Sequence, residues 1–174
     1  MSRLRLAGWA LAALGVVALV VGVVLLISGG DSAPQAGGGS GGSLGRELRS
    51  ARRAQAPFGA LTEADVHVGQ RLLHVVVADD ESERGQGLRR RSDIGSYQGM
   101  LFVFPAPSSA SFTMSTVPVP LDIGFYDAGG RLVDRLRMAP CAGTESQCPL
   151  YRPSGAFLYA LETLADGLPE GSLH

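Results

Sequence analysis

The sequence predicts an α+β domain built mainly from antiparallel strands, forming a small curled sheet or barrel-like fold with one short helix. It also predicts a single N-terminal transmembrane helix before this domain. From residue 58 onward, short apolar runs alternate with turns rich in Gly, Pro and Asp, which is typical of hairpin-connected strands. One polar segment between two such runs carries helix-capping residues. The chain also contains an uncharged, largely apolar run of 22 residues, 6–27, close to its N-terminus.

Residues 6–28 form the predicted membrane segment. At a rise of 1.5 Å per residue, such a run can cross a hydrocarbon core about 30 Å thick. A cleaved secretory signal is the alternative, although its apolar region is usually only about 7 to 15 residues long. Arg3 and Arg5 precede the run, and only Asp31 is charged just after it, which favours a cytoplasmic N-terminus. We expect a cytoplasmic stub at residues 1–5, a lipid bilayer around residues 6–28, and the remainder outside the cell membrane, or secreted if the signal is cleaved.

Residues 29–57 are predicted to be a disordered Gly/Ser/Arg linker, because they offer little apolar surface to offset the entropy cost of ordering. Within them, RELRSARR at 46–53 could dock on anionic headgroups, but its few apolar residues favour a solvated charge run. Residues 58–174 form the predicted extracytoplasmic domain. They carry nine Arg and fourteen acidic residues, and this acidic balance argues against nucleic acid as a partner.

The first elements of the domain are a strand, a helix and a second strand. RLLHVVVADD at 71–80 alternates as a half-buried strand does. Asp80 and Glu83 have capping-box spacing, and the arginines at the end of segment 78–91 suit the helix dipole, so we expect a short surface helix there. GMLFVFP at 99–105 is a continuous apolar run closed by proline, which indicates a buried strand.

The second half of the domain begins with a hairpin over residues 121–138, whose turn is supplied by residues 127–130. In the return strand, Asp134 shares the parity of the apolar residues, so a buried carboxylate there would need a partner. Residues 156–164 form a last strand by residue type, although a helix is almost as compatible with them.

Cys141 and Cys148 are the two cysteines of the chain. A structural zinc site needs about four ligands, and no second ligand pair of the usual spacing is present. Redox pairs favour Cys-x-x-Cys, whereas six residues separate these two. In an oxidising space outside the cytoplasm the pair is therefore predicted to form a disulfide.

Several separated motifs resemble the domain-of-unknown-function 192 family, over about residues 64–164. These motifs are Glu83-Arg84-x-x-Gly87-Leu88 after a strand, GMLFVF at 99–104, Pro120-Leu121-Asp122-Ile123, Pro140-Cys141 and Cys148-Pro149-x-Tyr151. The resemblance implies a compact β-rich domain of uncharacterised biochemical role, often exported or membrane-tethered in bacteria and archaea.

The chain also departs from the family pattern. Residues 87–91 read Gly-Leu-Arg-Arg-Arg where relatives commonly read Gly-Leu-Met-Phe-Arg. Thr113, Ser115 and Thr116 stand where relatives have Trp, Lys and Asn, so a site lined by those residues in relatives is modified or lost here. The shared residues supply the candidate ligand-binding set, which is Arg84, Met100, Met114, Asp122 and Tyr151.

Two of these candidates have competing roles. Asp122 either accepts hydrogen bonds from nearby backbone N–H groups, which we favour, or belongs to a site. Arg84 either pairs with an acid on a strand, which we favour, or anchors an anionic ligand.

No catalytic, metal-binding or cofactor-binding pattern is recognisable. The histidines, at positions 67, 74 and 174, lack metal-ligand spacing, and no nucleophile or phosphate-loop motif is present. We therefore expect a non-enzymatic, membrane-tethered binding or accessory module of the cell envelope, whose partner is an envelope ligand or protein. The alternatives are a small acid/base enzyme using Asp122 with Arg84 or Asp134, and a purely structural domain.

Overall fold

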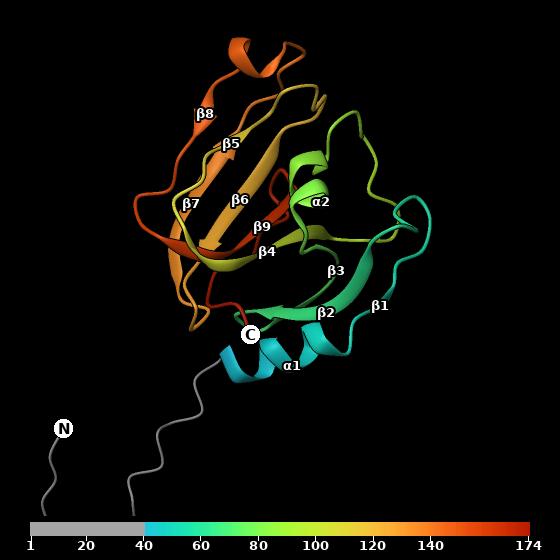
Figure 1. Cartoon of the computed structure of the whole chain (residues 1–174), viewed down its shortest axis with the longest axis vertical. Coiled ribbons are helices and arrows are strands. Elements are labelled where there is room, and N and C mark those ends of the chain that lie inside the picture. Colours follow the sequence, from blue (N-terminus) through green and yellow to red (C-terminus); the bar gives the residue numbers. More distant parts are fainter. Residues whose placement is uncertain (1–40) are drawn as a thin grey trace, which may run out of the picture. The chain divides into compact units, whose positions relative to one another are not determined.

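A computed structural model of the chain describes residues 41–174 (Figure 1). The predicted membrane segment, residues 6–28, and the stub before it lie outside the described residues. Among residues 41–174, no helix is both long enough and apolar enough to cross a bilayer.

The described part of the chain is an open, mostly antiparallel sheet with few helices, which confirms the predicted mainly antiparallel α+β class. Seven strands follow the order β1-β2-β3-β4-β9-β6-β7, and β5 and β8 form a separate two-stranded sheet. Among the strands of residues 41–174, β3 and β4 form the one parallel pair. The sheet ends at β1 on one side and at β7 on the other, so the barrel-like alternative is wrong. The strands are β1 Arg52–Arg53, β2 Thr62–Val68, β3 Arg71–Ala78, β4 Gly99–Ser108, β5 Phe112–Thr113, β6 Leu121–Tyr126, β7 Leu132–Met138, β8 Leu150–Tyr151 and β9 Phe157–Leu164.

The predicted strands and hairpin are present. Strands β3 and β4 occupy the two apolar runs, and β6 and β7 pair as the expected hairpin. In its turn, Asp127 Oδ1 accepts hydrogen bonds from the N–H groups of Gly129 and Arg131. The last segment is the strand β9, which lies between β4 and β6 near the middle of the sheet (Figure 1).

Helix α2, Glu81–Gln86, begins with the predicted capping box. Asp80 Oδ1 accepts a hydrogen bond from Glu83 N at 2.8 Å, and the Glu83 carboxylate accepts one from Asp80 N in return. The helix ends at Gly87, whose φ of 47° an L side chain rarely adopts. This glycine explains why the helix is shorter than the predicted segment 78–91.

Residues 41–57 differ from the predicted disordered linker. Helix α1, Gly41–Arg49, is followed by β1, which pairs with β2. Leu44 is fully buried, and Leu48 packs against the same core cluster. Because these leucines are four residues apart, they lie on one helix face and bury it against the sheet, while Arg46 and Arg49 stay exposed. The surrounding glycines concealed this short apolar period.

The sheet buries a core on each face. One face, called the aromatic face here, carries Met100, Phe102, Ile123 and Phe125 and is covered by α2 and by the β5–β8 sheet. The opposite face, called the α1 face, carries Val75, Leu101, Tyr126 and Leu161 and packs with Leu44 of α1. Since neighbouring strand residues point to opposite faces, the two cores separate the side chains of each strand into two groups.

Candidate functional site

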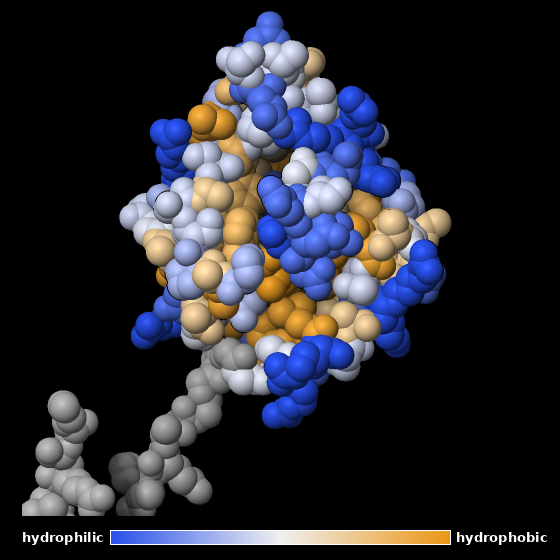
Figure 2. Space-filling view, in the orientation of Figure 1, coloured by the Kyte–Doolittle hydropathy of each residue, from blue (hydrophilic) through white to orange (hydrophobic). Residues whose placement is uncertain are grey.

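A pocket of about 340 Å³ opens on the aromatic face, beside α2. In Figure 2, apolar surface borders the hydrophilic surface that lies over α2. The walls come from α2 with the turn after it, β4, β5, β9 and the loop that contains the cysteines. The lining residues are Arg84, Gly85, Gln86, Gly87, Leu88, Arg89, Phe102, Phe104, Ala110, Ser111, Phe112, Thr113, Val117, Glu145, Leu150 and Glu162.

The sheet side of this pocket carries a buried acid, Glu162. It lies on β9, and its cross-strand neighbours are Met100 on β4 and Ile123 on β6. The residue is only 5% exposed, and within residues 41–174 its carboxyl group has no hydrogen bond or ion pair. Burial raises the pKa of the Glu162 carboxyl to about 8, because desolvation disfavours the charged form. At neutral pH this side chain is therefore mostly a neutral carboxylic acid.

Aromatic rings form much of the pocket wall. Phe112 meets Phe102 edge to face, with ring centroids 5.2 Å apart, and meets Phe104 at 6.5 Å. These T-shaped contacts fix the rings relative to one another and leave apolar surface toward the pocket. The lining therefore combines rigid apolar surface with a single buried carboxyl group.

Arg84 lies at the edge of the pocket but makes no ion pair among the described residues, so the favoured pairing with a strand acid is wrong. Its Nη1 donates to the backbone carbonyls of Asp79, at 2.6 Å, and Val103, at 2.8 Å. Its guanidinium carbon lies 5.1 Å from the centroid of the Phe104 ring. Arg84 thus ties α2 to β4 and holds a pocket ring in place.

Arg89 joins the turn after α2 to the opposite wall. Its Nε donates to Gly85 O at 3.1 Å, its Nη1 donates to Ser115 O at 3.2 Å, and its Nη2 pairs with the Glu145 carboxylate. Glu145 belongs to the 3-10 helix η1, Glu145–Gln147. This bridge holds η1 at the pocket edge.

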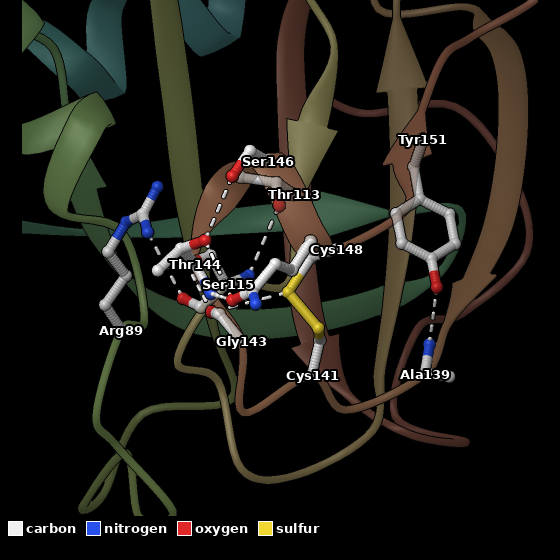
Figure 3. The surroundings of a disulfide bond; sticks show 11 residues. Arg89, Thr113, Ser115, Ala139, Cys141, Gly143, Thr144, Ser146, Cys148 and Tyr151 are labelled. Atoms are coloured by element: carbon white, nitrogen blue, oxygen red, sulfur yellow. Dashed lines mark hydrogen bonds between the residues drawn. A yellow bond between two sulfur atoms is a disulfide. The ribbon is translucent and has the colours of Figure 1, made fainter.

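The cysteine prediction is confirmed, because Cys141 and Cys148 form a disulfide (Figure 3). The loop that they close contains η1 and lies against the segment after β5. There, Ser115 Oγ donates to Gly143 O at 2.9 Å (Figure 3). The bond holds the loop that brings Glu145 to the pocket and excludes a zinc site built on these two sulfurs.

The predicted ligand-binding residues do not gather at one site. Of the five, only Arg84 lines the pocket. Met100 and Met114 are fully buried in the core of the aromatic face. Tyr151 is partly buried, and its hydroxyl accepts a hydrogen bond from Ala139 N at 2.9 Å (Figure 3).

Asp122 lies on the α1 face, across the sheet from Arg84. It is 3% exposed, accepts a hydrogen bond from Asp166 N at 2.8 Å, and pairs with Arg137 on the neighbouring strand. These contacts agree with the favoured structural role, although the backbone donor comes from a distant loop. Asp122 and Arg84 therefore do not share a pocket.

Asp134 is satisfied locally. Its carboxylate accepts hydrogen bonds from Ser154 N at 2.7 Å and from Arg135 N at 2.8 Å. Burial opposes ionisation, but these donors outweigh it and hold the Asp134 pKa below its ordinary value. The partner that the sequence analysis required for the Asp134 carboxylate is therefore supplied by the backbone N–H groups of Ser154 and Arg135.

A second polar cluster links β2, β3 and the turn before β4. Tyr97 Oη donates to the Glu63 carboxylate at 2.6 Å, and this hydrogen bond is the main reason why the Glu63 pKa is lowered. His74 Nδ1 lies 2.7 Å from Asp65 Oδ1, and the His74 ring stacks on Tyr97. Among residues 41–174, no group of three His, Cys, Asp or Glu side chains is placed to hold a metal ion. The cluster is a structural tie on the aromatic face, toward the β1–β2 edge of the sheet.

Apart from Arg84, the residues that line the pocket were not among the predicted ligand-binding residues. Glu162 is the single acid within the apolar run AFLYALETL, and a charged residue in an otherwise apolar strand was the available signal. The signal for Arg89 and Phe112 was weaker. Arg89 lies in a segment that departs from the family pattern, and Phe112 directly precedes Thr113, which also departs from it.

Comparisons with known proteins address the family and the fold. The profile of the DUF192 family, described as "Uncharacterized ACR", matches residues 62–170. A protein of unknown function from Novosphingobium aromaticivorans is similar in structure, with a TM-score of 0.60 and 24% identity over 72% of this chain and 94% of that one. A candidate transcription regulator from Sinorhizobium meliloti has a TM-score of 0.53 and 24% identity over 63% of this chain and 89% of its own. No protein of curated function matches the sequence. At this identity the two structures show a shared fold.

Proposed function

The chain belongs to the DUF192 family, and we propose that its domain is a non-enzymatic binding module that holds a small, largely apolar ligand in the pocket beside α2. The observation that carries this proposal is the buried, unpartnered carboxyl group of Glu162 at the pocket. The Glu162 oxygens are not among the fully buried, unpartnered side-chain atoms of residues 41–174, so they reach the open pocket and lack only a hydrogen-bond partner there. A ligand in the pocket would supply it.

The rest of the lining supports binding rather than catalysis. Acid/base catalysis needs groups free to exchange protons with a substrate. The other carboxylate at the pocket, Glu145, is already paired with Arg89, and the Arg84 guanidinium is held by two carbonyls. Phe102, Phe104 and Phe112 instead provide the apolar walls that are usual in small-molecule sites.

We further propose that the module is tethered to the cell envelope through residues 6–28. The uncharged run and the two arginines before it support this location. The Cys141–Cys148 disulfide supports it as well, because such bonds persist mainly in oxidising compartments. Labelling of the native membrane with an impermeant thiol reagent, with and without prior reduction, tests this. We expect labelling of intact cells only after reduction, whereas thiols that are labelled only once the membrane is permeabilised would contradict an extracytoplasmic domain.

A thermal-shift screen of small uncharged aromatic and aliphatic compounds, on the full chain in phospholipid nanodiscs, tests the binding function. At a ligand concentration 100 times Kd, a specific hit adds about 2.7 kcal/mol of stability. Thr113→Trp places a large ring in the pocket wall and should abolish the shift, whereas Asp122→Asn, on the other face of the sheet, should keep it. Hits that stabilise all three proteins equally, or measurable turnover of a hit, would contradict the proposal.

A further inference from the structure

The charges around the pocket restrict the kind of ligand that it can accept. Two arginines, Arg84 and Arg89, and one acid, Glu145, line it besides Glu162. Because Glu145 pairs with Arg89, the remaining formal charge is the positive charge of Arg84. The cross-strand neighbours of Glu162, Met100 and Ile123, are uncharged. A ligand cation would therefore meet an unfavourable positive charge at the pocket.

Burial keeps the Glu162 carboxyl neutral below about pH 8. A neutral carboxylic acid has one O–H donor and one carbonyl acceptor. A primary amide group, –CO–NH2, offers the complementary acceptor and donor on the same side. An ammonium ion offers donors only, a carboxylate offers acceptors only, and a hydrocarbon offers neither, so none of the three matches both the donor and the acceptor of Glu162.

We propose, on the basis of the binding function proposed above, that the pocket recognises an uncharged amide group attached to an aromatic or similarly flat apolar body, with Glu162 as the hydrogen-bonding residue. The amide carbonyl accepts the Glu162 O–H, and the amide N–H donates to the Glu162 carbonyl oxygen. The apolar body packs against Phe102, Phe104 and Phe112, whose edge-to-face arrangement suits a planar ring. No bond is made or broken, and the proton remains on Glu162.

Four probes with the same ring separate the possible headgroups: benzamide, benzylamine as its ammonium ion, benzoate and toluene. Binding is measured by chemical-shift titration of the full chain in phospholipid nanodiscs, with the free probe concentration determined independently. At pH 6.5 we expect benzamide to bind at least about tenfold more tightly than toluene, because it gains two neutral hydrogen bonds. Benzylammonium should bind no better than toluene.

Two variants test the role of Glu162 itself. Glu162→Gln keeps one donor and one acceptor and should retain the preference for benzamide, whereas Glu162→Leu should reduce it to the level of toluene. For the native protein, the affinity for benzamide should fall about tenfold per pH unit above pH 8, and for Glu162→Gln it should not. Asp122→Asn is the control on the other face and should behave as the native protein does.

The possible failures are distinguishable. Preferred binding of benzylammonium that is lost in Glu162→Gln would overturn the amide inference and leave the binding function in place. So would preferred binding of benzoate. If none of the four probes, toluene included, perturbs the pocket residues at millimolar concentration, then the pocket does not accept an apolar ring, and the proposed binding function fails as well.

Discussion

Replacing Glu162 by Gln should change how the stability of the domain depends on pH. The native carboxyl has a pKa of about 8, whereas its ordinary value in an unfolded chain is 4.5. Between these values the folded state holds one proton that the unfolded state has released. Stability therefore falls as pH rises, by about 1.4 kcal/mol for each pH unit. The contribution of the neutral group is complete below pH 4.5, decreases through neutral pH, and is lost above about pH 8.

The magnitude follows from the two pKa values. Over the whole interval from 4.5 to about 8 the native protein should lose roughly 5 kcal/mol, and about 3 kcal/mol of this by pH 7. Glu162→Gln has no ionisable group at this position and escapes the loss. The variant should thus be close to the native protein in stability at pH 5 and clearly more stable at pH 8 and above.

The assay is chemical denaturation of both proteins from pH 5 to pH 9. The quantity of interest is the difference between their free energies of unfolding, because the contributions of the three histidines are common to both proteins and cancel. Asp134, whose pKa is lowered, is ionised throughout this range and adds no slope. Parallel pH profiles for the two proteins would refute the reasoning. They would mean that Glu162 ionises in the folded state at an ordinary pH.

Three further variants test the structure around the pocket. Replacing both Cys141 and Cys148 by Ser opens a loop of eight residues and should lower the free energy of unfolding by about 2 to 3 kcal/mol in denaturant titrations, whereas an unchanged midpoint would mean that the loop is held without the bond. Asp122→Asn weakens the ion pair with Arg137 and should cost about 2 kcal/mol in the same titration without changing ligand affinity; a loss of affinity would place Asp122 in the site. Gly87→Ala forces a side chain into a left-handed φ of 47° and should lower stability by about 1 kcal/mol, and a thermal midpoint equal to that of the native protein would exclude this strain.

The fold could be predicted because its signals are local. The capping box of Asp80 and Glu83 and the turn at Asp127 each involve only a few neighbouring residues. Strand β4 is recognisable in the sequence as a continuous apolar run. Helix α1 was missed because its apolar period consists of Leu44 and Leu48 alone, in a segment dominated by glycine. Its stability comes from contact with the sheet rather than from its own propensity.

The site could not be predicted in the same way, because both faces of the sheet are buried. Where one face is solvated, strand parity tells which residues point inward. In β6 all six residues are buried, so parity separates Asp122 from Ile123 but does not say which of them faces a pocket. Arg84 raised a similar difficulty, since its partners are backbone carbonyls, which any sequence supplies and no motif marks.

The two segments in which the chain departs from the family pattern lie at the same pocket. Arg89, which stands where relatives commonly have Met, and Thr113, which stands where they have Trp, both line it. A threonine occupies much less volume than a tryptophan, so Thr113 leaves room in this wall that the family pattern would fill. Arg89 in turn attaches η1 to that wall through Glu145. Because one change removes bulk and the other adds a tie to a neighbouring loop, the pocket wall of this chain differs from the wall that the family pattern predicts.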